Sequence, residues 1–176
     1  EMLSCLVGSE MCIRDRMSRM FQGCEKFNQS LNNWDVSSVI DMQRMFYEGY
    51  NNPATFNCDI SLGDVSGVTK MKRMFVNTIY NIDISSWDVS NVTNMNELFY
   101  NAENFNSNIS MWDVSNVTNM SGMFSGANNF NADISSWDVS SVTSMFGMFN
   151  SASSFNVDIS SWLSLIHISE PTRQDS

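Results

Sequence analysis

The stretch "MFSGANNFNADISSWDVSSVTSMFG", residues Met123–Gly147, decides the fold because the chain repeats it. The stretch before it, "LFYNAENFNSNISMWDVSNVTNMSG" at Leu98–Gly122, has the same length and matches it column by column. A Met-Phe or Leu-Phe pair recurs at intervals of 25, 29, 24, 25 and 25 residues. The pairs are Met20-Phe21, Met45-Phe46, Met74-Phe75, Leu98-Phe99, Met123-Phe124 and Met148-Phe149. Repeats of this length indicate stacked units that share one continuous core.

Apolar residues stand at fixed columns of each unit, and we expect these columns to form the core. They include an aromatic residue, an aliphatic residue, a Trp and a D-V-S-x-V-x-x-M motif. In the most regular units the expected core residues are Phe105, Ile109, Trp112, Val114, Val117, Met120, Met123, Phe124, Ala127, Phe130, Ile134, Trp137, Val139, Val142 and Met145. The second unit departs from the pattern, with Gly63 in the Trp column and an insertion at 47–56 that we expect to form a loop.

The spacing inside each unit predicts one short helix and one short strand. Between 142 and 152, apolar residues recur at offsets of 0, 3, 6, 7 and 10, which is helical spacing, and Ser140 precedes them as an N-cap would. We therefore expect a helix over 141–152. The stretch "NADISSW" at 131–137 predicts a strand that pairs in parallel with its counterparts in neighbouring units. The expected fold class is an α/β solenoid of about six turns.

Both ends differ from the repeats in composition. "LVGSEMCIRDR" (Leu6–Arg16) and "LSLIHISEPTR" (Leu163–Arg173) are what the two strands of one transposase-type sequencing adapter encode. Segments of this origin are excluded before any reasoning about fold. We expect 1–16 and 163–176 to be adapter-derived and 17–162 to be the repeat domain, a piece of a longer array cut at both ends.

The composition of 17–162 narrows the classes of function. This region has six Lys and Arg against fourteen Asp and Glu, a net charge of −8. Such a balance argues against nucleic acid and against an anionic membrane surface as partners. No stretch is long and apolar enough to span a bilayer. Its two cysteines, Cys24 and Cys58, do not make a disulfide framework.

The ladder of motifs, written "MFxxAxxFNxDISxWDVSxVTxM", resembles the BspA-like leucine-rich repeats of bacterial surface proteins and lipoproteins. The resemblance covers essentially all of 17–162. It implies a right-handed leucine-rich-repeat-like stack with a strand and a short helix per turn. It also implies a secreted or surface-anchored protein that adheres to a protein or glycan ligand; the membrane would be reached through an anchor outside this fragment.

Catalysis and metal binding are weakly supported by the residue pattern. The region 17–162 has no His, and paired carboxylates such as Asp83 and Asp88 recur in Asp133 and Asp138, whereas active sites are usually single. We therefore expect no enzyme activity and no cofactor. One acidic column offers oxygen ligands that suit Ca²⁺, but Asn and Ser replace Asp in it, which favours bonds to turn backbone. That column is Ser30, Asp59, Asp83, Asn108, Asp133 and Asp158.

Two residue types remain to be assigned. Trp87, Trp112 and Trp137 form either a platform for a carbohydrate or peptide or part of the core, and their fixed spacing favours the core. Cys24 stands in the Ala column of the other units, so we expect a small packed residue there. Cys58 has no assigned role.

A binding module is the function that these observations favour, since stacked repeats present extended surfaces to large partners. Two alternatives stay open. One is a structural stalk or spacer, and the other is binding to ice or a crystal surface through ladders of Asn, Ser and Thr.

Overall fold

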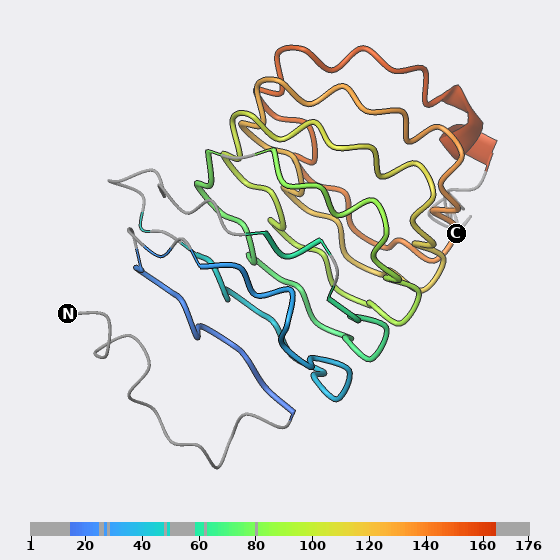
Figure 1. Cartoon of the computed structure of the whole chain (residues 1–176). Helices are drawn as coiled ribbons and strands as arrows, with labels where there is room; N and C mark the ends of the chain where they lie inside the picture. Colours follow the sequence, from blue (N-terminus) through green and yellow to red (C-terminus); the bar gives the residue numbers. More distant parts are fainter. Residues whose placement is uncertain are drawn as a thin grey trace, which may run out of the picture.

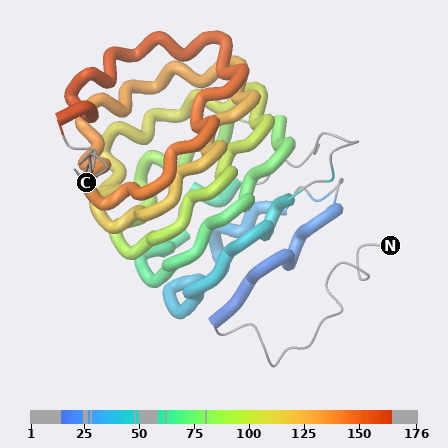
Figure 2. Tube along the Cα trace, turned by 180° about the vertical axis from the view of Figure 1, so that it is seen from behind, coloured from blue at the N-terminus to red at the C-terminus, as the bar shows by residue number. Residues whose placement is uncertain are grey.

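The protein is a stack of coils, one for each sequence repeat. We describe residues 15–24, 27, 29–47, 49, 59–61, 63–79 and 81–164 of a computed structural model. Successive coils lie side by side in the order of the sequence, from the blue end to the red end (Figures 1 and 2). We number them coil 1 to coil 6 by their first residues, which are Met17, Met42, Met71, Met95, Met120 and Met145.

Neighbouring coils meet through a line of single parallel β-bridges. Each bridge joins the residue before one coil's first Met to the equivalent residue of the next coil. The line runs through Arg16, Asp41, Lys70, Asn94, Asn119 and Ser144. It fixes the register, so every sequence column becomes a row of residues across the stack.

The backbone divides its hydrogen bonds between the coil and the stack. Alternate N–H groups of the segment 95–101 donate to carbonyls of the equivalent segment one repeat later, 119–125, with N···O distances of 2.7–2.9 Å. These pairs are Met95 to Asn119, Glu97 to Ser121, Phe99 to Met123 and Asn101 to Ser125. The intervening groups, such as the N–H of Leu98 and of Tyr100, donate to carbonyls three residues earlier in the same coil. Each segment is thus a chain of overlapping turns whose remaining groups are satisfied by the neighbouring coil.

The helix expected over 141–152 is wrong. Gly147 and Ser151 have φ values of 63° and 60°, in the left-handed region that no right-handed helix contains. The carbonyls of Phe146 and Met148 accept bonds from Gly122 and Phe124 of coil 5 instead of closing helical rings. The apolar spacing is real, but it comes from repeated turns that all bury the same side of the segment.

The strand expected at 131–137 is also wrong. Asp133 folds this segment into a turn by accepting a bond from the Ser135 N–H, and no ladder forms there. Within the described residues, the parallel pairing consists of isolated bridges, and the helical structure consists of one 3-10 helix, η2 (Ser160–Ser164). The expected α/β leucine-rich-repeat-like solenoid, with a strand and a helix per turn, is therefore contradicted. The coil count follows the repeats, but the coils are built from turns.

The core is a set of apolar rows along the stack. Of the fifteen residues named as core columns, thirteen are buried. The other two, Val142 and Met145, lie toward the C-terminal end of the stack and have intermediate exposure. Phe rings of successive coils stack with centroids about 5.6–5.9 Å apart; this row is Phe21, Phe46, Phe75, Phe99, Phe124 and Phe149. A single unit cannot bury these apolar residues, whereas stacked units bury them against one another.

Three parts of the chain depart from the repeat pattern: the insertion in coil 2, the two ends of the chain and Gly63. Most of the insertion at 47–56, in which we expected a loop, lies outside the described residues, namely Glu48 and 50–56. Residues 1–14 and 165–176 lie outside them as well. Asp15 and Arg16 are exposed, although their backbone continues the stack against Ile40 and Asp41. Gly63 borders an apolar cavity of about 30 Å³ next to Trp34 and Trp87, where the missing Trp ring of the column would lie.

Candidate binding surfaces

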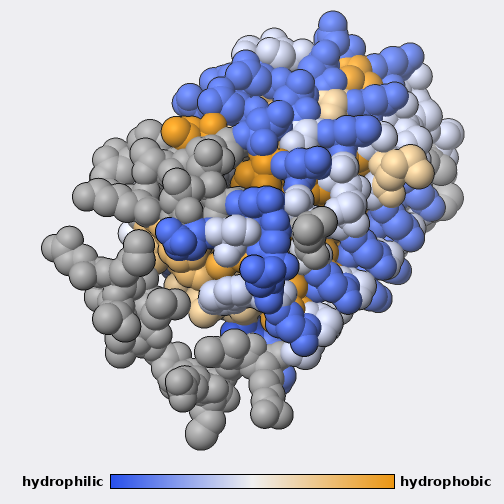
Figure 3. All heavy atoms as spheres, viewed as in Figure 1, coloured by the Kyte–Doolittle hydropathy of each residue, from blue (hydrophilic) through white to orange (hydrophobic). Residues whose placement is uncertain are grey.

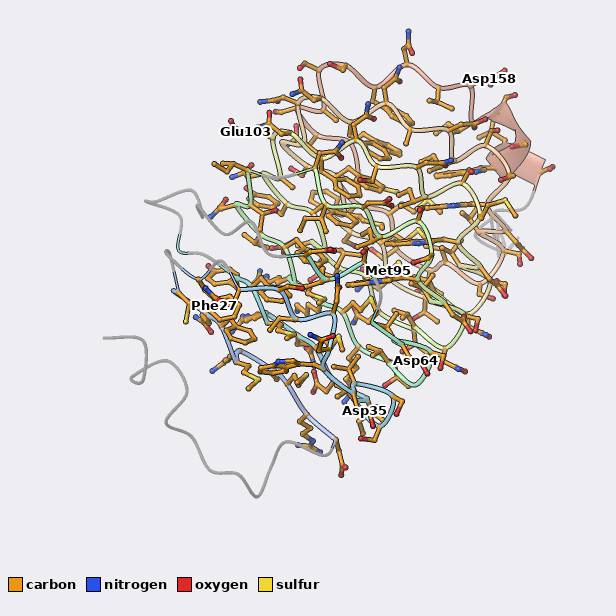
Figure 4. All side chains as sticks on the ribbon, in the orientation of Figure 1. Phe27, Asp35, Asp64, Met95, Glu103 and Asp158 are labelled. Carbon is orange, nitrogen blue, oxygen red and sulfur yellow. The ribbon has the colours of Figure 1, made fainter. Side chains whose placement is uncertain are left out.

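Aspartates organise the corners of the coils. Oδ1 of Asp83 accepts both the backbone N–H and the hydroxyl of Ser85, at 3.1 and 2.7 Å. Oδ1 of Asp138, in the column that follows the Trp, accepts the Ser140 N–H at 3.0 Å. These corners face outward along one edge of the stack, where Asp35 and Asp64 are labelled in Figure 4. Each carboxylate therefore caps its own turn.

The same bonds favour the charged form of the carboxyl groups. The Ser85 hydroxyl, and then its N–H, hold the pKa of Asp83 below the ordinary value of 3.8. The Ser135 N–H and hydroxyl lower the pKa of Asp133 in the same way. A depressed pKa in an exposed, repeated acid fits a capping role. A proton-transfer site near neutral pH would need the opposite shift.

In the acidic column that suggested a Ca²⁺ site, the side-chain oxygens accept hydrogen bonds from their own turns. Asn108 fills it in coil 4 and accepts the same two Ser110 bonds that an Asp accepts in other coils, at 3.1 and 2.8 Å. Asp83 and Asp88 each bind their own Ser, at 85 and at 90. Among the residues that the structure describes, no group of three or more potential ligands could hold a metal ion.

The Trp column lies inside the stack. Trp87, Trp112 and Trp137 are between 2% and 5% exposed, and each indole N–H donates to an Ile carbonyl of the preceding coil. Trp162 is equally buried, but its indole N–H has no partner. The rings tie coils together, and none of them offers a face to a ligand.

Polar rows on the outside are also bonded within the stack. The hydroxyl of Thr118 donates to the Thr93 carbonyl, and that of Thr143 donates to the Thr118 carbonyl, both at 3.0 Å. The amides of Asn91 and Asn116 reach carbonyls one coil back in the same manner. Hydrophilic residues form rows over the described surface in Figure 3. Many of these side chains have their donors committed to protein acceptors.

One surface row differs from coil to coil. It is the residue after the first Met of each coil, and we call it the variable row: Ser18, Gln43, Lys72, Asn96, Ser121 and Phe146. Phe146, a large apolar side chain, is 88% exposed. The segments that carry this row lie side by side across the stack in Figure 2. The row therefore places side chains of differing polarity, charge and size at regular intervals along the stack.

Cys24 is buried at 7% exposure, as expected of the small-residue column, and it is disulfide-bonded. The bond was not predicted, and its partner cysteine lies outside the described residues. Cys58, to which no role was assigned, also lies outside them. Disulfides persist in oxidising compartments.

The stacked turns and single core define a repeat protein. The chain belongs to the family described as "Mycoplasma protein of unknown function, DUF285", which matches it over residues 13–80 and 76–170. No curated protein matches the chain. No solved structure matches it either. Among the described residues, no helix has the length and apolar character to cross a membrane.

Proposed function

We propose that this protein is a binding module of the cell surface or of the secreted space, and that it holds a macromolecular partner on the face that carries the variable row. The observation that carries the proposal is the contrast between rows. The repeated Asp, Thr and Trp side chains serve the stack itself. The variable row carries five different residue types and includes the exposed ring of Phe146, although Gln43, Asn96 and Ser121 of this row also bond within the stack.

Two further observations support a location at the cell surface or in the secreted space. The motif ladder resembles BspA-like repeats of bacterial surface proteins and lipoproteins, for which adhesion to a protein or glycan is expected. The disulfide of Cys24 is of the kind that oxidising compartments maintain. Neither observation names the ligand.

The test uses a matched pair of variants. Phe146→Ser and Met111→Ser each remove a large exposed apolar side chain, 88% and 86% exposed. Each introduces the residue that the same row carries in a neighbouring coil, Ser121 and Ser136. The full chain and both variants are assayed on arrays of glycans and of extracellular matrix proteins.

We expect the wild type to bind at least one array member, Phe146→Ser to lose most of that binding, and Met111→Ser to keep it. Equal binding by both variants would remove the variable row from the proposal. A chain that binds nothing on either array would fit a stalk or spacer. Thermal hysteresis in the same preparation would instead indicate binding to ice.

A further inference from the structure

The basic residues of this acidic chain gather at one place. All six Lys and Arg that the structure describes lie in or just before the first segments of coils 1 to 3: Arg16, Arg19, Arg44, Lys70, Lys72 and Arg73. The capping aspartates Asp35, Asp64 and Asp83 belong to other columns of the repeat. The charge is thus segregated, and a positive region exists on a chain whose net charge is −10.

A groove runs through this positive region. It has a volume of about 400 Å³ and is lined by Ser18, Arg19, Gln43, Arg44 and Lys72, from three successive coils. Every lining residue can donate a hydrogen bond, and three of the five carry a positive charge. Parallel segments lie about 4.8 Å apart, so the basic groups of coils 1 to 3 can converge on one ligand.

The charges in the groove are not neutralised by acids of the described chain. The ion pair that the structure shows in this region joins Arg73 to Glu97, at 2.8 Å, and Arg73 does not line the groove. Asp41 lies close by but is only 9% exposed, and its carboxylate accepts both N–H groups of Gln43. Arg44 lies over the ring of Tyr47, 5.8 Å from its centroid, which restrains its guanidinium.

The backbone conformation at Arg19 and Arg44 determines how an arginine of the groove can be replaced without distorting the coil. Arg19 and Arg44 have φ values of 62° and 55°, in the left-handed region that favours glycine. Every coil has a positive φ in this row: Arg73 and Glu97 hold it in coils 3 and 4, at 59° and 53°, and Gly122 and Gly147 hold it in coils 5 and 6. An arginine in this row costs stability that a glycine would not.

The dimensions and charge restrict the ligand. Guanidinium groups pair with tetrahedral oxyanions through two parallel hydrogen bonds, and Lys binds phosphate as a point charge. The groove spans three coils, and the acidic remainder of the chain repels a long polyanion such as nucleic acid. We propose that this groove is a binding site for a compact ligand bearing phosphate or sulfate groups. The groove shares Ser18, Gln43 and Lys72 with the variable row. The inference does not rest on the proposed function, because it needs only the charges of coils 1 to 3 and no partner held at Phe146.

The experiment measures binding of inorganic tripolyphosphate and of a sulfated disaccharide to the full chain by titration calorimetry. The groove variants are Lys72→Gln and Arg44→Gly, and the second keeps the backbone conformation. Lys70→Gln is the matched control, because it removes the same charge two residues from Lys72 and outside the groove lining. Thermal melts of every variant accompany the titrations.

We expect the wild type to bind at least one of the two probes, and each groove variant to weaken that binding about tenfold, as the loss of one charged hydrogen bond does. Lys70→Gln should stay within about threefold of the wild type, which is the change expected from long-range charge alone. Arg44→Gly should melt no lower than the wild type while it loses affinity.

Further measurements distinguish a lipid headgroup from a soluble molecule as the ligand that carries the oxyanion. Vesicles of phosphatidylglycerol, bound in preference to phosphatidylcholine and released by Arg44→Gly, would point to a lipid headgroup. Tripolyphosphate binding without vesicle binding would point to a soluble phosphate. The proposal is overturned if neither probe binds, if Lys70→Gln weakens binding as much as Lys72→Gln, or if an oligonucleotide binds more tightly than both probes.

Discussion

A single oxygen atom sets each corner of the stack. Oδ1 of Asp83 or of Asn108 accepts two bonds from the Ser two positions later, and the chain reverses there. The equivalence of the two side chains shows that an acceptor atom is required at the corner and that a charge is dispensable.

This equivalence leads to a prediction for Asp83. Asp83→Asn should keep the melting temperature within about 1 °C, because the amide oxygen replaces the carboxylate oxygen, whereas Asp83→Ala should lower it by about 2–4 °C, as the loss of one capping bond does. Thermal melts followed by circular dichroism would measure both. Equal losses in the two variants would mean that the negative charge itself stabilises the corner.

Two glycines with positive φ should differ in what they tolerate. A Cβ at Gly147 (φ 63°) would meet nothing closer than 3.9 Å, so Gly147→Ala should cost about 1 kcal/mol from backbone strain alone. A Cβ at Gly126 (φ 73°) would lie 2.1 Å from Oδ1 of Asn101 and 3.3 Å from its Cα. Gly126→Ala should therefore cost roughly twice as much or more. Urea denaturation measures the two free energies, and a smaller loss at Gly126 would contradict this packing.

The predictability of single residues follows from what fixes them. The Asp corners were predictable because Asp and Asn bond to their own following backbone, which is a local property. The groove of Arg19, Arg44 and Lys72 was not, because these residues are far apart in sequence and meet only once the coils are in register. A count of basic residues by repeat column would have found it.

Each coil consists of overlapping turns and not of the expected helix and strand, because its backbone forms hydrogen bonds with the neighbouring coils. Half of the backbone N–H groups in a segment such as 95–101 donate to the next coil, so no helical hydrogen-bond pattern can close. The apolar spacing that suggested a helix cannot reveal these bonds, because they are not local. The glycines at 122, 126 and 147, each within a segment read as helical, were the signal against it.

Gly63, which stands in the Trp column of coil 2, gives a prediction for a pair of glycines. A Cβ at Gly63 would lie 3.5 Å from Cγ2 of Val36, at ordinary contact distance, beside a cavity. Gly63→Ala should stabilise the fold by about 0.5–1 kcal/mol, since it restricts the unfolded chain and fills space. Gly67→Ala is the control, because its Cβ would lie 3.0 Å from the Ser37 carbonyl oxygen and should destabilise. Urea midpoints would show the two shifts, and a loss at Gly63 would mean that coil 2 packs differently.

Across the whole molecule, the corner carboxylates make stability depend on pH. Hydrogen bonds from Ser residues lower the pKa of eight carboxyl groups below 3.8: Asp35, Asp59, Asp64, Asp83, Asp113, Asp133, Asp138 and Asp158. A group whose pKa is lower in the folded state stabilises that state above its unfolded pKa. This contribution disappears as the pH falls through the folded pKa.

The urea midpoint should therefore change little between about pH 6 and pH 5 and decline below about pH 4. The variant Asp133→Asn should decline less steeply, because its amide does not titrate. A midpoint that rises steadily down to about pH 3 would show that repulsion among the acids outweighs the capping bonds.

The stack as a whole was predictable from the repeat, since a fixed period of aligned apolar columns has few other solutions. The path of the backbone within each coil was not, because bonds between coils decide it. The assignment of 1–16 and 163–176 to an adapter stays a prediction, and most of those residues lie outside the described part of the chain.

The measurement that tests the central claim most directly is NMR detection of scalar couplings across backbone hydrogen bonds. The account predicts couplings from the amide nitrogen of Gly122 to the carbonyl carbon of Phe146, and from Phe124 to Met148, whose N···O distances are both 2.9 Å. It also predicts shifts typical of positive φ at Ser151. Couplings within 141–152 between residues four apart, with helical shifts throughout, would contradict the stack of turns and restore a helix in each coil.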